Sequence, residues 1–184
     1  MLKPNKNVFG GGKNTNLLGL KYEEDTNLIE FFINLGYLIR DVSVGREVYD
    51  GKKLKFLHLK KHEVYKFLKS HNIDWKKCGL SKKILPDELV IIGNNVIVFE
   101  KKSQVQGGST DEKLATCDFK LKEYTKLFKP LKKKVKYVYI LNDWFKRDEY
   151  KSVLKYIKST GCDYYYNEIP LNILKLKDLK NGSK

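Results

Sequence analysis

Acidic and basic side chains stand at both ends of the apolar stretch PDELVIIGNNVIVFEKK, residues 86–102. Asp87 precedes the first apolar run, and Glu100 and Lys102 end the second. Side chains directly opposed on paired strands lie about 5 Å apart at Cβ, a spacing that lets two carboxylates hold one divalent cation. Oxygen ligands favour Mg²⁺ or Mn²⁺, and a nearby lysine can orient or deprotonate a water, or stabilise a phosphate. These residue types therefore predict phosphodiester hydrolysis.

The turn between the two runs decides whether the three side chains share a face, because alternate residues of a strand face the same side. A two-residue turn at Gly93-Asn94 puts Asp87 opposite Glu100, and one at Asn94-Asn95 puts it opposite Lys102. Both registers place the three polar groups on one face, whereas a three-residue turn without a bulge would not. Gly-Asn is an accepted hairpin turn, so we expect the common face.

The alternative interpretation is a salt-bridged cluster at the strand ends. A functional cluster of exposed charges can be removed at a cost of no more than about 0.5 kcal/mol. A structural cluster would lower the melting temperature strongly when it is removed, which distinguishes the two.

The elements that must position these residues follow from apolar periodicity and turn residues. They predict an α/β fold, with a mixed central sheet (an antiparallel hairpin plus parallel crossover strands) flanked by helices. We expect one domain over residues 1–184, with an irregular arm at 1–14 and a lysine-rich tail at about 171–184. The expected helices are 15–35, 60–70, 110–128 and 147–160, and the expected strands are 37–44, the two around Asp50-Gly51, 88–92, 96–100, 134–141 and 162–166.

Histidine and cysteine are poor candidates for a metal site in this sequence. His58 and His62 are four residues apart at a predicted helix, but the order is not H-E-x-x-H and no third ligand stands nearby. We interpret them as polar positions near a helix start. The three scattered cysteines form no CxxC pair and are interpreted as reduced thiols of the core.

The charge balance favours a polyanionic partner. The chain has 37 lysines and arginines against 22 acids, a net charge of +15, which predicts binding to nucleic acid. Only three of the basic residues are arginines, a bias that an AT-rich coding genome can also produce. No uncharged apolar window of about 18 residues exists and no signal peptide is recognised, so we expect a cytoplasmic protein without a membrane span.

The motif Pro86-Asp87 … Glu100-Lys101-Lys102 resembles the PD-(D/E)xK nuclease superfamily, the fold of many type II restriction endonucleases. Twelve residues separate Asp87 from Glu100, within the usual range of that family. Residues 19–23, GLKYE, are similar to the G-L-x-[FY]-E stretch on the first helix of small restriction-type nucleases, and residues 100–120 to their catalytic strand and next helix. The resemblance covers residues 14–142 and implies a restriction endonuclease-like core that leaves 5′-phosphate and 3′-hydroxyl ends.

The resemblance also implies roles for individual residues. Asp87 and Glu100 would ligate Mg²⁺, for which Mn²⁺ can substitute, and the Lys101 carbonyl would add a ligand. Lys102 would position or activate the attacking water. Glu23 would hold a second metal or orient Lys102, with an exposed helix acid as the alternative interpretation.

Candidates for DNA contact lie next to these residues. Gln104 shares the face of Lys102 if the strand continues, and would touch a phosphate or the minor groove. Ser109 is interpreted either as a plain helix cap or as a phosphate site together with the free amides of its helix. Lys113, and Lys13 and Asn14 in the arm, complete the set. A restriction enzyme implies three partners: double-stranded DNA, a cognate DNA methyltransferase, and a second copy of the chain if the target is palindromic.

Two other functions remain open at this point. A Holliday-junction resolvase-like or repair nuclease is also small and basic and carries an E-x-K motif. A non-catalytic nucleic-acid-binding protein would explain the charge equally well. The exonuclease branch of the superfamily is disfavoured, because Lys120 stands where that branch has the glutamine of Q-x-x-x-Y.

Overall fold

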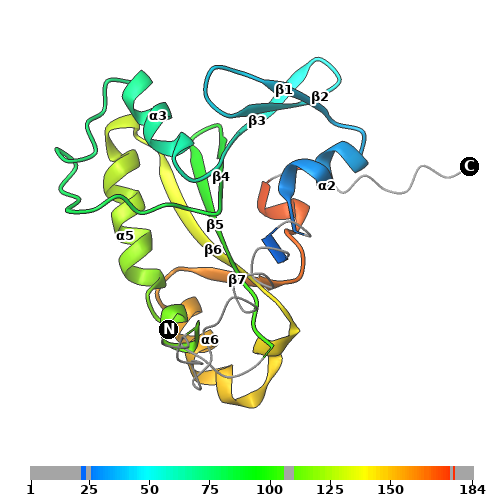
Figure 1. Ribbon diagram of the computed structural model, residues 1–184, viewed down its shortest axis with the longest axis vertical. Coiled ribbons are helices and arrows are strands. Elements are labelled where there is room, and N and C mark those ends of the chain that lie inside the picture. Colours follow the sequence, from blue (N-terminus) through cyan, green and yellow to red (C-terminus); the bar gives the residue numbers. More distant parts are fainter. Residues whose placement is uncertain (1–21, 24–25, 106–109, 175, 177–184) are drawn as a thin grey trace, which may run out of the picture.

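The computed structural model describes residues 22–23, 26–105, 110–174 and 176. One seven-stranded sheet runs through the molecule, with its strands side by side in sequence order (Figure 1). Neighbours are antiparallel from β1 to β5, whereas β5, β6 and β7 are parallel. The expected mixed α/β sheet is thus confirmed, with strands β1 (Leu38–Asp41), β2 (Arg46–Asp50), β3 (Lys53–Leu59), β4 (Glu88–Ile92), β5 (Asn95–Lys102), β6 (Lys134–Leu141) and β7 (Asp163–Tyr166).

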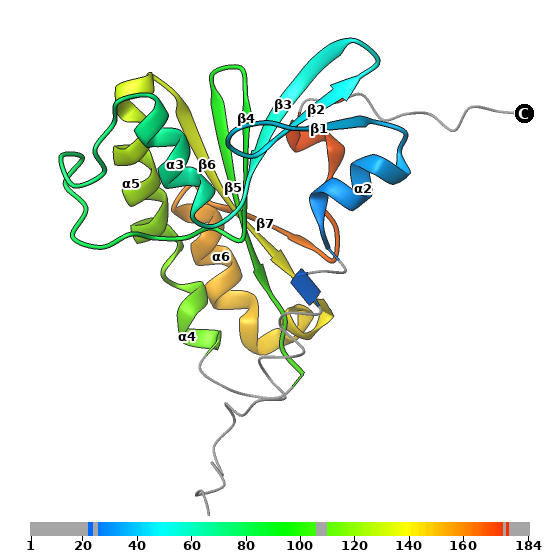
Figure 2. The same ribbon diagram turned by 45° about the horizontal axis from the view of Figure 1, so that its top comes forward.

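Helices cover both faces of the sheet (Figures 1 and 2). Alternation along β5 makes both faces apolar: Val96 and Val98 pack on one side, and Ile97 and Phe99 on the other. The first side carries α3 (Glu63–Ser70), α5 (Cys117–Phe128) and α6 (Lys151–Ser159). The second carries α2 (Leu28–Asn34) and a 3₁₀ helix at Leu171–Leu174. Right-handed crossovers explain why α5 and α6, which connect parallel strands, share a face.

The turn between β4 and β5 has two residues. Ile92 pairs with Asn95, so Gly93 and Asn94 form the turn, and Gly93 has a φ of +53°. Glycine adopts positive φ without steric cost, which suits the first position of such a hairpin turn. The predicted two-residue turn is therefore confirmed, in the register that brings Asp87 opposite Glu100.

The single helix expected over residues 110–128 is wrong. Two helices, α4 (Thr110–Leu114) and α5, occupy this stretch. The Tyr139 hydroxyl lies 3.1 Å from the Lys113 carbonyl and 3.3 Å from that of Leu114, and the Thr116 hydroxyl donates to Lys113 O at 2.7 Å. Side chains thus occupy the carbonyls that a continuous helix would use.

His58 does not belong to a helix start, which corrects that interpretation. It lies on β3, which continues through Leu59, and its side chain is fully buried. It faces α2 because it shares the parity of Phe56, which packs on that side. His62 alone sits at a helix start, as the residue before α3.

The cysteines and the C-terminal segment can also be compared with the expectations from the sequence. Cys78, Cys117 and Cys162 are all free thiols, and the latter two are buried. Leu174 is fully buried, so the segment expected as a tail begins by packing against the sheet. Residues 1–14, Ser109 and residues 177–184 lie outside the described part of the chain. In the described part, no helix combines the length and apolarity that a membrane crossing requires.

Candidate active site

Asp87 stands immediately before β4, at the end of the hairpin where β4 begins and where β5 continues beyond it to Lys102. Its Oδ2 accepts a hydrogen bond from the Lys101 backbone N–H at 2.7 Å, which extends the β4–β5 ladder by one side-chain contact. The preceding carbonyl, of Pro86, accepts from the Lys61 N–H at 3.1 Å. Asp87 is therefore fixed from both sides, by β5 and by the turn before α3.

Glu100 and Lys102 lie two residues apart on β5 and point to the same face as Asp87. Lys102 Nζ is 2.8 Å from Glu100 Oε1. Glu100 is only 7% exposed, so the expectation of exposed charges at the strand ends is wrong. The cause is the length of β5, which extends to Lys102 alongside β6 and keeps Glu100 covered.

Lys120 is a further member of this cluster that the sequence did not reveal. Its Nζ also lies 2.8 Å from Glu100 Oε1, reaching down from α5. The helical spacing offered a signal, since Tyr124 stands one turn later on the same face and is fully buried against the sheet. Two ammonium groups therefore bind one oxygen of Glu100.

The charges of the cluster change one another's pKa. Burial, reinforced by the negative charge of Glu100, raises the pKa of Asp87 to about 6. Burial also opposes ionisation of Glu100, but Lys102 and Lys120 outweigh it and keep the pKa of Glu100 below its usual value. Burial would lower the pKa of Lys102, yet Glu100 and Asp87 outweigh it and raise that pKa. Lys102 and Glu100 are thus both charged at neutral pH.

Glu23 approaches the cluster from the far end of the sequence. Its Oε2 lies 3.6 Å from Lys61 Nζ, and its side chain is about one-third exposed. Its negative charge contributes to raising the pKa of both Asp87 and Lys102. The structure thus brings Glu23 to the same end of the sheet, next to the turn that fixes Asp87.

The donor set suits a hard divalent cation. Among the described residues, Asp87 Oδ1 and Glu100 Oε2 have no hydrogen-bond partner. The Lys101 N–H points to Asp87, and the carbonyl of a strand residue points to the same neighbour as its N–H, so a third oxygen faces this side. No group of three or more His, Cys, Asp or Glu side chains gathers for a metal within the described ranges. Mg²⁺, which retains several waters and also binds substrate phosphates, fits two carboxylates and a carbonyl.

The candidates for DNA contact are distributed differently from the expectation. The condition under which Gln104 would share the face of Lys102 is not met, because β5 ends at Lys102 and does not continue to Gln104. Asn142 brackets the backbone of Gln104: its Oδ1 accepts from Gln104 N–H at 3.2 Å and its Nδ2 donates to Gln104 O at 2.8 Å. The Gln104 side chain is buried, so it presents no exposed contact. Lys113 is exposed on α4, whereas Lys13, Asn14 and Ser109 fall outside the described residues.

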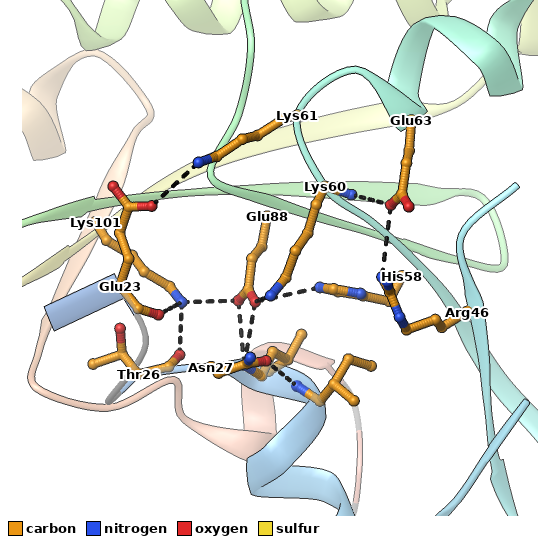
Figure 3. A network of polar contacts seen from close by, with 12 residues as sticks. Glu23, Thr26, Asn27, Arg46, His58, Lys60, Lys61, Glu63, Glu88 and Lys101 are labelled. Carbon is orange, nitrogen blue, oxygen red and sulfur yellow. Dashed lines mark hydrogen bonds and ion pairs between the residues drawn. The ribbon is translucent and has the colours of Figure 1, made fainter. Parts of the chain in front are cut away.

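A second polar cluster lies on the opposite face of the same two strands (Figure 3). Glu88 follows Asp87, and Lys101 stands between Glu100 and Lys102, so both point toward α2. Lys101 Nζ is 3.2 Å from Glu88 Oε2, and His58 Nε2 and Lys60 Nζ each lie 3.4 Å from Glu88 Oε1. The sequence carried a signal for this cluster, since Glu88 and Lys101 share the parity of apolar residues that face the core on the α2 side of the hairpin.

Compared with protein-family models, with curated protein sequences and with solved structures, the chain shows no match to any of them.

Proposed function

We propose that this chain is a Mg²⁺-dependent endonuclease that hydrolyses DNA phosphodiester bonds. One observation carries the proposal: Asp87, Glu100 and Lys102 share one face of the β4–β5 hairpin, with oxygens of both carboxylates left for a cation. The net charge of +15 supports a polyanionic substrate. The resemblance of the motif to PD-(D/E)xK nucleases supports the same chemistry.

The residues divide the work as follows. Asp87, Glu100 and the Lys101 carbonyl would hold the cation, which would polarise the phosphate and lower the pKa of a bound water. Because Lys102 and Lys120 both bind Oε1 of Glu100, the other oxygen, Oε2, is the one left for the cation. Lys102 carries a proton, since its pKa is raised. We therefore assign it the orientation of the attacking water and the stabilisation of negative charge on the phosphate.

Within nucleases, we propose a type II restriction endonuclease with a restriction endonuclease-like core. Its substrate would be a short specific duplex site, and its products would have 5′-phosphate and 3′-hydroxyl ends. A cognate methyltransferase would protect the host DNA, and a palindromic site would favour a homodimer. The similarity of residues 19–23 to restriction-type nucleases supports this choice over a junction resolvase or a repair nuclease.

Plasmid cleavage tests the chemistry. We expect the wild type to nick or linearise supercoiled plasmid with Mg²⁺ and to stop when EDTA is added. Asp87→Asn and Lys102→Met should lower the rate at least about 100-fold, the usual loss for a group that stabilises a transition state. Lys120→Met should also lower the rate, by about tenfold or more, because Glu100 then keeps only one of the two ammonium groups that bind it.

Matched controls come from α6 and the turn before it. Asp148 is a carboxylate whose side chain is 87% exposed, and Lys155 is an exposed lysine. Asp148→Asn and Lys155→Met should cleave as the wild type does. Equal nicking by the wild type and all variants, or none by any of them with intact DNA binding, would reject the nuclease in favour of a binding protein.

Substrate choice separates the two kinds of nuclease. Unmodified genomic DNA is digested, and the fragment ends are sequenced. A restriction enzyme gives ends that share a short sequence. Cleavage of a four-way junction, with linear duplex of any sequence left intact, would instead assign the site to a junction resolvase.

A further inference from the structure

The ammonium group of Lys101 is buried and has three polar partners, one for each of its N–H donors. Its side chain is only 1% exposed, and an ammonium group has three N–H donors. Its Nζ donates to Thr26 O at 2.7 Å and to Glu23 O at 3.0 Å, and it faces Glu88 Oε2 at 3.2 Å. Two of these three partners are backbone carbonyls of the segment that carries Glu23.

Glu88 holds the other end of the same segment. The backbone N–H of Leu28, the first residue of α2, donates to Glu88 Oε1 and Oε2 at 3.3 and 3.4 Å. A carboxylate at a helix N-terminus satisfies a free amide and interacts favourably with the helix dipole. Lys101 therefore binds the carbonyls of Glu23 and Thr26, as Figure 3 shows, and Glu88 binds the amide of Leu28.

The same two strands bear the candidate catalytic residues on their other face. Glu88 directly follows Asp87, and Lys101 lies between Glu100 and Lys102. Because successive side chains of a strand alternate, one face presents the proposed metal ligands and the other face binds the backbone that leads to Glu23. The carboxylate of Glu23 points away from Glu88, toward Lys61 (Figure 3).

We propose that Glu88 and Lys101 are positioning residues, which fix Glu23 relative to Asp87 and Lys102 by binding its backbone. This inference rests on the proposed nuclease function and deepens it. A buried ion pair alone is weak evidence for stability, since an uncharged pair of similar volume often replaces it without loss. We call the contacts of Glu88 and Lys101 with this backbone the anchor. Its backbone partners distinguish it from a simple ion pair, because an uncharged pair fills the same space but does not bind the carbonyls of Glu23 and Thr26.

A double-mutant cycle tests whether the pair acts through Glu23. The neutral pair Glu88→Gln/Lys101→Met avoids leaving one buried charge unpaired. We expect it to lower the cleavage rate at least tenfold in the chain with Glu23, and less than twofold in a chain that already carries Glu23→Gln. Equal losses in both backgrounds would mean that the pair serves the fold alone, and would overturn the proposal.

A second ion pair, on α5, provides the control. Glu123 is buried and pairs with Lys126, so Glu123→Gln/Lys126→Met makes the same chemical change away from Glu23. It should leave the cleavage rate within twofold of the wild type. If Glu88→Gln/Lys101→Met does not fold, Lys101→Arg keeps the charge, changes the geometry of the donors, and enters the same cycle.

Amide hydrogen exchange tests the anchor without any need for cleavage. The backbone amides of residues 26–31 should exchange at least tenfold faster in Glu88→Gln/Lys101→Met than in the wild type, while those of β6 stay unchanged. Unchanged exchange at residues 26–31 would overturn the anchor even in an active enzyme. Faster exchange in a protein that cleaves no DNA would keep the anchor and reject the nuclease function, so the two failures are distinguishable.

Discussion

At the scale of single residues, the candidate site concentrates charge that folding alone would avoid. Asp87 and Glu100 are brought together on adjacent strands, and Glu100 is kept ionised only by Lys102 and Lys120. Groups whose pKa is strongly perturbed are typical of functional sites. Such a site is expected to reduce the stability of the fold in exchange for activity.

Asp87→Asn is therefore expected to stabilise the protein. The pKa of Asp87 is about 6 in the folded state and near 3.9 in an unfolded chain. The folded state therefore favours the protonated form of Asp87. The stability that Asp87 contributes is fully present below about pH 4, and it is lost as the pH rises through about 6, because the carboxyl must then ionise in a buried site. Asparagine does not ionise and can still accept from the Lys101 N–H. We expect the variant to be more stable than the wild type by about 1–2 kcal/mol at pH 7.5, the shift being discounted for partial exposure.

Urea unfolding in EDTA, at pH 4.5, 6.0 and 7.5, measures this difference. The advantage of the variant should shrink as the pH falls, since Asp87 then binds a proton in the wild type. Comparing the two proteins at each pH cancels the other titrating groups. A variant that is less stable than the wild type at pH 7.5 would show that the carboxylate serves the structure.

The sequence revealed some of these residues and hid others for a physical reason. Asp87, Glu100 and Lys102 stand within one hairpin, so their common face depends only on local register. Lys120 belongs to another element, and its contact with Glu100 depends on how α5 packs on the sheet. Glu88 and Lys101 were visible in the sequence, but their partners at residues 23–28 are sixty or more positions away from Glu88.

At the scale of elements, predictions succeeded where the determinants are local. The strands expected at 88–92 and 134–141 have those bounds as β4 and β6, because each is an apolar run ended by turn residues. The break between α4 and α5 could not be foreseen, since it is stabilised by the hydroxyl of Tyr139 on β6. His58 was assigned to the wrong element because β3 extends further than its local pattern suggests.

Gly45 supports the buried end of β3 and should tolerate no side chain. It lies in the turn between β1 and β2 with a φ of +85°, and a Cβ there would collide with the His58 carbonyl oxygen and the Leu59 side chain. Gly45→Ala should cost about 2–4 kcal/mol, because positive φ strain adds to a clash with backbone. Thermal unfolding should show a melting temperature lower by about 5–15 °C.

Gly51→Ala is the matched control, in the neighbouring turn between β2 and β3. Gly51 has a φ of +56°, but nothing lies within 4 Å of a Cβ built there. Its substitution should cost only the conformational strain, about 1 kcal/mol. Equal losses at the two glycines would show that the close approach of Gly45 to β3 does not matter.

At the scale of the whole molecule, the sheet order joins segments that the sequence does not relate. Local patterns predict strands on both sides of α3, but not that β3 and β4 pair across it. That pairing brings His58 and Lys60 to Glu88 and the turn at Lys61 to Asp87. Local sequence patterns do not encode such long-range pairing, so the position of the site within the sheet could not be predicted from the sequence.

The net charge of +15 should make DNA binding strongly dependent on salt. Each phosphate that a lysine or arginine neutralises releases condensed counterions, so contacts to six or more phosphates weaken binding at least about 1,000-fold between 50 and 200 mM salt. Fluorescence anisotropy with a labelled 30-base-pair duplex in EDTA measures this slope without cleavage. A loss of less than tenfold would show that few lysines face the DNA, and that the lysine content reflects the coding genome. A steep slope shared by the wild type and Lys155→Met, but shallower for Lys120→Met, would identify the face around Glu100 as the surface that binds the phosphates.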